Sequence, residues 1–240
     1  MSTVEEMAPG GRQSCWLPMD EIRPNARQPR KVFQDMALLE LAEKYDILVL
    51  EDNPYGELRF DGEDVPTLKS LDKYGRVMYV GSFSKVLAPG LRLGYAIGPK
   101  PLIAKMTVAK QGEDVHTALL PQMIAERFLA ETDFAAHVER LRTLDRAKAH
   151  RMLDAMDEKL PSGITWVRPE GGLFVWCRLP DSTDMLGYVR RAVEKSVAVV
   201  PGTAFLTDQS EVSHSIRLNF STPTDEQIDR GIEILGGLAL

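Results

Sequence analysis

Two serines, a lysine and an arginine follow a short apolar run near the middle of the sequence. The run is VMYV at 77–80, and Ser82, Ser84, Lys85 and Arg92 come after it. An apolar run bounded by glycine is typical of a buried strand of a parallel sheet, and ligands of such sheets lie beyond the carboxyl ends of the strands. An unprotonated lysine amine attacks carbonyl carbons, while serine hydroxyls and arginine bind phosphate. We therefore predict a site where Lys85 attacks a carbonyl compound beside a bound phosphate group.

A second apolar run leads to an acid. ILVL at 47–50 is predicted as another buried strand, with Glu51 and Asp52 at its carboxyl end and Tyr55 shortly after them. Carboxyl ends of parallel strands meet at one edge of a sheet. We therefore expect a buried Asp52 carboxylate to lie opposite Lys85.

A third candidate lies near the end of the chain. Residues 215–221, SIRLNFS, alternate strictly, with Ile216, Leu218 and Phe220 facing one way and Arg217 facing the other. The guanidinium fork of an arginine binds a carboxylate with two parallel hydrogen bonds. Arg217 is therefore predicted to bind the carboxylate of a substrate.

Two segments resemble one known family. GSFSK at 81–85, followed by LRLGY at 91–95, is similar to the cofactor-lysine region of class I/II pyridoxal-phosphate aminotransferases of fold type I. ELAEKYDILVLEDNPYGELRF at 40–60 resembles the same family closely. The resemblance implies an α/β fold class: a partial fold type I transferase with a mainly parallel large-domain sheet and an α+β carboxyl-terminal small domain.

The same resemblance implies pyridoxal 5'-phosphate as the cofactor and transfer of an amino group between an amino acid and a 2-oxo acid. In the family the lysine forms a Schiff base with the cofactor and carries protons. The aspartate pairs with the pyridinium nitrogen, the tyrosine reaches the phenolic oxygen, and an arginine holds the substrate's α-carboxylate. Carried over by motif, the catalytic residue is Lys85, the cofactor residues also include Asp52, Tyr55, Ser82, Ser84 and Arg92, and the substrate residue is Arg217.

The resemblance covers residues 37–240 and begins partway through the family's chain. We expect residues 37–132 to form part of a cofactor-binding domain and residues 133–240 to form a linking helix and a small domain. Residues 1–36 are expected to be a flexible or foreign leader, in which 17–33 resembles the start of ParB-type partition proteins. We therefore expect a truncated aminotransferase that has weak activity or none in isolation. The resemblance also implies a homodimer, if the truncated chain folds.

Composition argues against general binding of nucleic acid or membranes and against a metal site. A net charge of −6 offers no general attraction to nucleic acid or to anionic membranes. The two cysteines and four histidines lack metal-ligand spacing, so no metal site is predicted. No apolar run is long enough to span a membrane, and a cytoplasmic location is expected.

Two alternatives stay open at this stage. One is a non-catalytic effector-binding module of MocR type that uses the same residues to sense the cofactor. The other is a nucleic-acid-binding protein of ParB type, which depends on residues 17–33 alone.

Periodicity and capping signals predict the remaining elements. Helices are expected at 36–45, 100–111, 119–130, 134–160, 184–196 and after a capping box at Thr224–Gln227, and strands at 93–97, 164–167, 172–179 and 197–200.

Overall fold

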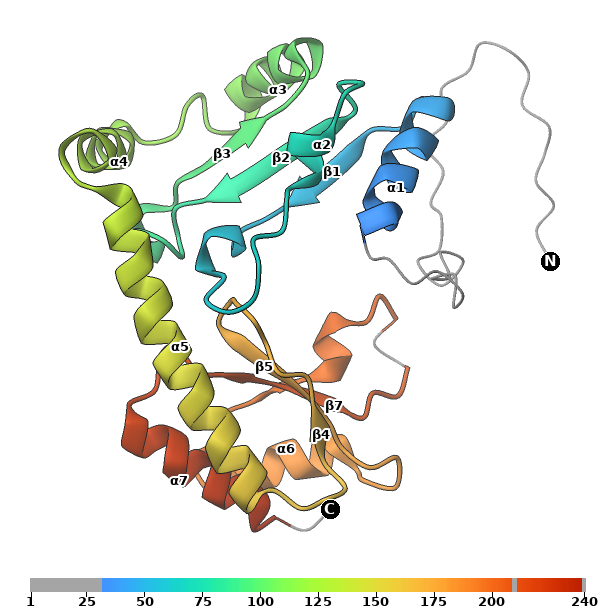
Figure 1. The fold of residues 1–240 in the computed structure, drawn as a ribbon, viewed down its shortest axis with the longest axis vertical. Coiled ribbons are helices and arrows are strands. Elements are labelled where there is room, and N and C mark those ends of the chain that lie inside the picture. The colour runs from blue at the N-terminus through green and yellow to red at the C-terminus, as the bar shows by residue number, and fades with distance from the viewer. Residues whose placement is uncertain (1–31, 209–210, 239–240) are drawn as a thin grey trace.

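The computed structural model describes residues 32–208 and 211–238, and it contains two separate sheets (Figure 1). The predicted ParB-like stretch lies almost entirely in residues 1–31, outside the described residues. Helix α1 (Val32–Lys44) begins inside the segment predicted as a leader, so the helix starts four residues earlier than periodicity indicated.

The first sheet has three strands in the order β1 (Val49–Asp52), β2 (Val77–Ser82) and β3 (Gly94–Ile97). Strand β1 pairs with β2 in parallel, as expected, and β3 pairs with β2 antiparallel. Helices α3 (Lys100–Glu113) and α4 (Leu119–Glu131) follow β3, close to their predicted positions.

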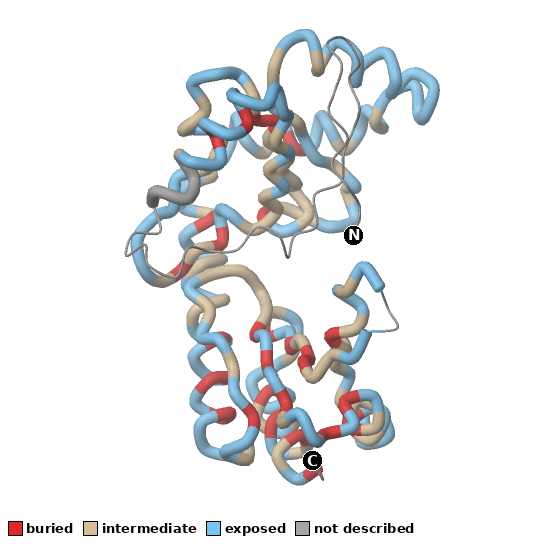
Figure 2. The backbone as a smooth tube through the Cα atoms, turned by 90° about the vertical axis from the view of Figure 1, so that its right-hand side faces the viewer, coloured by how far each residue is buried: buried red, intermediate tan, exposed pale blue. Residues whose placement is uncertain are grey.

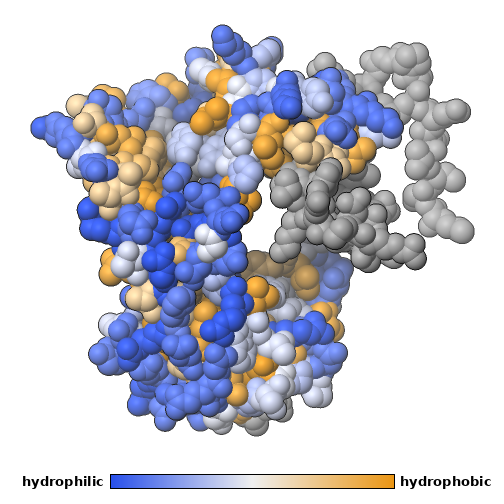
Figure 3. Space-filling view, viewed as in Figure 1, coloured by the Kyte–Doolittle hydropathy of each residue, from blue (hydrophilic) through white to orange (hydrophobic). Residues whose placement is uncertain are grey.

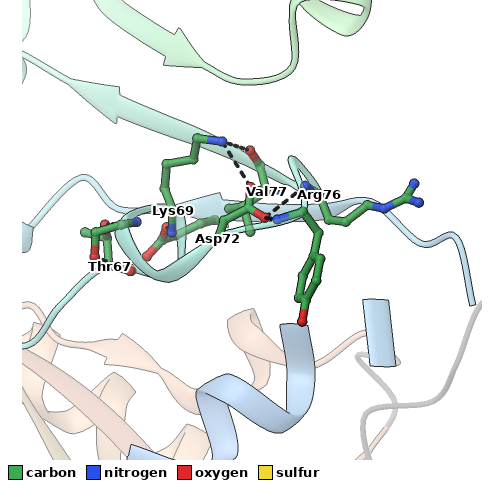
Figure 4. Close-up of polar contacts among 8 residues, drawn as sticks. Thr67, Lys69, Asp72, Arg76 and Val77 are labelled. Carbon is green, nitrogen blue, oxygen red and sulfur yellow. Dashed lines mark hydrogen bonds and ion pairs between the residues drawn. The ribbon is translucent and has the colours of Figure 1, made fainter. Parts of the chain in front are cut away.

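A buried carboxylate organises the turn that leads into β2 (Figure 4). Short helix α2 (Leu68–Leu71) begins at Thr67, whose side chain accepts a hydrogen bond from the N–H of Ser70. Just after it, Asp72 accepts from the backbone N–H groups of Arg76 and Val77 and from the Lys69 ammonium group. Burial opposes ionisation, but these hydrogen bonds outweigh it and lower the pKa of Asp72 to about 2. The ionised side chain thus fixes where β2 starts.

One long helix links the two sheets. Helix α5 (Phe134–Lys159) begins at Asp133, whose side chain accepts from the N–H of Ala136, and ends just before Pro161. It packs along α7 (Asp225–Gly236), which opens with the predicted capping box of Thr224 and Gln227 (Figure 1).

The second sheet is wholly antiparallel, in the order β4 (Thr165–Trp166), β5 (Phe174–Arg178), β7 (Ser215–Asn219) and β6 (Val200–Pro201). Helix α6 (Met185–Glu194) and the short 3-10 helix η4 (Gly202–Phe205) complete this region. The alternation predicted for residues 215–221 is confirmed, because Ile216, Leu218 and Phe220 are buried while Arg217 is not.

Most of the core lies between the second sheet and helices α5, α6 and α7 (Figure 2). Phe60, from the segment after β1, also packs in this core, where its ring meets that of Phe220 edge to face. The segment after β1 is further tied to the second sheet region, since Arg59 forms a β-bridge with Gly171. The structure does not test the domain division at residue 132, which stays a prediction.

The burial expected for strand 47–50 is wrong. Leu48 is 53% exposed and Leu50 is 66% exposed, because no layer of the described chain covers β1 on these sides. The three-stranded sheet thus leaves apolar side chains of β1 and β3 exposed, among them Leu50, Tyr95 and Ile97. Exposed apolar side chains also gather on α4, where Figure 3 shows apolar surface: Leu119, Leu120, Met123, Ile124 and Leu129.

No helix within the described ranges is both long and apolar enough to cross a lipid bilayer.

Candidate active site

The parallel pairing of β1 and β2 brings their carboxyl ends to one edge of the sheet. Asp52 is the last residue of β1 and is in register with Val80, two residues before the end of β2 at Ser82. The N–H of Asn53 donates to the carbonyl of Val80 at 3.0 Å, which extends the pairing past Asp52. The structure thus places Asp52 and the start of the lysine turn on neighbouring strands.

The turn that carries Lys85 is held at three points. The N–H of Ser84 donates to the Ser82 hydroxyl at 3.1 Å, and the N–H of Phe83 donates to the carbonyl of Leu93 at 3.0 Å. The imidazole Nε2 of His137, on α5, donates to the carbonyl of Val86 at 2.7 Å. Contacts from the Leu93 carbonyl, just before β3, and from the His137 side chain on α5 therefore hold the turn from which the lysine projects.

Lys85 and Tyr55 meet above the strand ends. The ammonium nitrogen of Lys85 lies 5.9 Å from the centroid of the Tyr55 ring, within the range of a cation–π contact. Within the described residues, the amine has no hydrogen bond or ion pair, so it is available to a ligand.

Tyr55 in turn contacts the second sheet. Its ring meets Phe174, at the start of β5, edge to face with centroids 5.9 Å apart. The guanidinium carbon of Arg217 lies 3.9 Å from the centroid of the Phe174 ring and 4.7 Å from that of Phe205. One continuous row of contacts thus joins Lys85, Tyr55, Phe174 and Arg217.

Arg217 carries a buried donor that is not used. Its Nε is buried and has no hydrogen-bond partner in the described part of the protein. Buried polar groups are nearly always hydrogen-bonded, and an orphaned one indicates a missing partner. Two flanking rings contact the guanidinium group but accept no conventional hydrogen bond, so Arg217 is suited to a carboxylate ligand.

A cleft of about 740 Å³ opens between the end of β1 and the start of β5. Asp52 and Tyr55 line one side, and Gly172 and Phe174 line the other. Lys85 is not among the described lining residues, although it contacts Tyr55, which is.

The expectation that Asp52 is buried is wrong. The Asp52 side chain is exposed, and Lys85 is exposed as well. The reason is the same as for Leu50: nothing in the described chain covers this face of the sheet. In the described residues, the Asp52 carboxylate also has no hydrogen bond or ion pair.

The backbone of Arg92 lies close to the turn that carries Lys85, but the Arg92 side chain does not contact that turn. It adopts a left-handed conformation with φ of 52°, and its guanidinium group donates to the carbonyl of Pro89 at 3.2 Å. Among the described contacts, none joins the Arg92 side chain to Ser82 or Ser84. The residues predicted to bind phosphate therefore lie near one another in the sequence and in the fold, but the Arg92 side chain does not meet the two serines.

Sequence reasoning missed Phe174 as a neighbour of Arg217 and Tyr55. The only signal was its place in a predicted strand at 172–179, which gives no information about a contact across the two sheets. Phe205, the last residue of η4, also contacts Arg217.

Comparisons with known proteins show the family of this chain. The family model "Aminotransferase class I and II" matches residues 34–235. The aromatic-amino-acid aminotransferase 1 of Thermococcus litoralis is 42% identical over 198 residues, which cover 82% of this chain and 47% of that protein.

Solved structures give the same result. The multiple substrate aminotransferase of Thermococcus profundus has a TM-score of 0.81 and 41% identity, covering 85% of this chain and 51% of that one. The α-aminoadipate aminotransferase LysN of Thermus thermophilus, solved with N-(5'-phosphopyridoxyl)-L-leucine, has a TM-score of 0.80 and 38% identity, covering 85% and 53%. This chain spans about half the length of these relatives. It belongs to the class I and II aminotransferase family.

Proposed function

We propose that this chain takes part in transfer of an amino group between an amino acid and a 2-oxo acid, with pyridoxal 5'-phosphate as cofactor. The observation that carries the proposal is the row of contacts from Lys85 through Tyr55 and Phe174 to Arg217. It joins an available amine to a buried guanidinium donor without a partner, so the donor set fits a ligand that bears a carbonyl and a carboxylate.

Each residue has a distinct role in this proposal. Lys85 would hold the cofactor covalently and move the proton of the substrate's α-carbon, and Asp52 and Tyr55 would contact the cofactor ring. Ser82, Ser84 and Arg92 would hold the phosphate, with Arg92 turning away from Pro89 to do so. When bound, the cofactor supplies an electron sink for the charge that develops at the α-carbon.

Arg217 would orient the substrate. Two hydrogen bonds from its guanidinium fork to the α-carboxylate place the α-hydrogen toward the lysine, which converts binding energy into correct geometry. The flanking Phe174 and Phe205 rings restrict the guanidinium plane, so less conformational entropy is lost on binding.

Turnover by the 240-residue chain alone is expected to be slow. Lys85 and Asp52 are exposed, and electrostatic stabilisation of a developing charge depends on excluding water. We propose further that the protein acts in the cytoplasm and without nucleic acid. We also propose that it forms a homodimer, and sedimentation velocity would test this oligomeric state.

Reductive labelling tests the central role of Lys85. The chain is incubated with pyridoxal phosphate, reduced with borohydride, digested and mapped by mass spectrometry. The phosphopyridoxyl group is expected on Lys85 and absent from a Lys85→Ala variant. Lys73→Ala, which removes another exposed lysine, should label like the unchanged chain. Label spread evenly over surface lysines would contradict the proposal.

A further inference from the structure

A second cavity adjoins the cleft, and the two share part of their lining. It measures about 290 Å³ and is lined in part by Asn53, Glu57 and Tyr79, which also line the cleft. Ser82, to which the function proposed above gives the phosphate, also lines this cavity, but that function assigns the cavity no ligand of its own.

Aromatic rings make up much of the wall of this cavity: Tyr79, Phe83, Tyr95 and Phe134. The Phe83 and Tyr95 rings have centroids 5.5 Å apart and planes inclined at 53°, and the Tyr79 and Tyr95 rings are 6.1 Å apart and inclined at 31°. Rings inclined in this way form adjoining walls, and each ring face carries negative charge density.

A glycine makes room for one of these walls. Gly81 is paired with Tyr95 across β2 and β3, and a Cβ at this position would lie only 2.5 Å from the Tyr95 ring. Any other residue at 81 would push the ring away. Gly81 therefore allows Tyr95 to lie flat over the strand beside Tyr79.

The charged side chain that lines the cavity is acidic. No lysine, arginine or histidine is among its described lining residues, whereas Glu57 contributes a carboxylate. Within the described chain, this carboxylate has no hydrogen bond or ion pair, although the Glu57 carbonyl accepts from Arg142. Burial and the neighbouring Tyr95 raise the pKa of Tyr79 to about 12, so the phenol stays neutral. Among the described lining residues, only Glu57 then brings a charged side chain.

From the aromatic walls and the unpaired Glu57 carboxylate, we propose that this cavity binds a small organic cation of the alkylammonium or quaternary ammonium class. Cations are attracted to the faces of aromatic rings, and cages of such rings recognise quaternary ammonium groups. The carboxylate adds an opposite charge at the wall shared with the cleft. The proposal does not depend on pyridoxal phosphate or on transamination.

Calorimetric titration of the whole 240-residue chain with choline tests the site. The uncharged carbon isostere 3,3-dimethyl-1-butanol has the same shape and separates charge recognition from apolar filling. We expect choline to bind at least about tenfold more tightly than the isostere. Equal affinities, or no choline binding up to about 10 mM, would overturn the proposal.

Two variants locate the binding. Tyr95→Leu keeps apolar bulk but removes a ring and is expected to weaken choline binding about tenfold. Glu57→Gln keeps shape but removes the charge and is expected to weaken it about threefold. Tyr74→Leu and Glu63→Gln, at exposed positions outside the cavity, serve as matched controls and should leave affinity unchanged. Unchanged affinity in both cavity variants, with unaltered circular dichroism, would place the choline elsewhere and sink the proposal.

Discussion

The ring of Tyr55 meets that of Phe174 edge to face, with centroids 5.9 Å apart and planes at 85°. Tyr55 lies in the segment just after β1, and Phe174 is the first residue of β5, so this contact connects the two sheets. It also connects the neighbour of Lys85 to the neighbour of Arg217. Both ends of the candidate site are therefore positioned by one aromatic pair.

A double-mutant cycle measures that pair. Tyr55→Leu, Phe174→Leu and the double variant are compared by urea unfolding, and a coupling free energy of about 1 kcal/mol is expected for an edge-to-face pair. The same cycle with Tyr74, which is exposed and makes no ring contact with any described residue, should give a coupling near zero. Strictly additive effects for Tyr55 and Phe174 would show that the ring contact does not join the sheets energetically.

Both the planar shape and the charge of the Arg217 guanidinium group are expected to contribute to binding of a 2-oxo acid. Arg217→Lys keeps a cation but not the planar fork, and it should weaken binding of a 2-oxo acid by about tenfold. Arg217→Met should weaken it by about a hundredfold, which corresponds to about 3 kcal/mol for hydrogen bonds to a charged group. Binding is measured by calorimetry on the cofactor-loaded chain.

Arg178→Lys is the matched control for that series. Arg178 lies on the neighbouring strand, is exposed and pairs with Asp181, so its replacement should leave 2-oxo acid affinity unchanged. If Arg217→Lys binds as tightly as the unchanged chain, a bidentate carboxylate contact at Arg217 is ruled out.

Local signals in the sequence predicted local structure well. The alternation at 215–221 gave the buried face of β7 correctly, and the Thr224–Gln227 pattern gave the start of α7. The strand predicted at 197–200 lies later, at 200–201, because Val197 still donates its N–H to Ala192 and closes the end of α6. Ser196, with φ of 64°, makes the turn that delays the strand.

Burial and long-range contacts could not be predicted in the same way. The apolar run at 47–50 predicted a buried strand, but burial needs a covering layer, and Leu50 is mostly exposed without one. For the same reason Asp52 is exposed rather than buried, and Lys85 is exposed as well. The contact of Phe174 with Tyr55 depends on how the two sheets face each other, which no local pattern encodes.

The capping box of α7 offers a test of local stability. Thr224 accepts a hydrogen bond from the N–H of Gln227, and its own N–H donates to the Gln227 side chain at 2.8 Å. Thr224→Ala should lower the free energy of unfolding by about 1 kcal/mol, because a helix-terminal N–H loses its partner. Thr222→Ala, two residues earlier and exposed, should change it by less than about 0.5 kcal/mol. Equal losses in the two variants would show that the cap contributes nothing specific.

Asp72 makes stability depend on acid pH in a defined direction. Its pKa is about 2 in the folded chain, below the ordinary value of 3.8, because hydrogen bonds from the Val77, Arg76 and Tyr74 N–H groups and from Lys69 outweigh the effect of burial. A group with a lowered folded pKa stabilises the fold above its ordinary pKa and loses this effect as the pH falls through the folded value. The difference between the two values corresponds to about 2 kcal/mol.

Unfolding free energies at several pH values between 2 and 5 check this contribution. The unchanged chain should lose about 2 kcal/mol more than Asp72→Asn over this range, because asparagine does not titrate there. At pH 5 the variant should be less stable by about 3 kcal/mol, since one amide oxygen cannot satisfy the donors that meet in the buried turn. Lys73→Ala, in the same turn, should keep the pH dependence of the unchanged chain. Parallel curves for the unchanged chain and Asp72→Asn would mean that other carboxylates, not Asp72, govern acid unfolding.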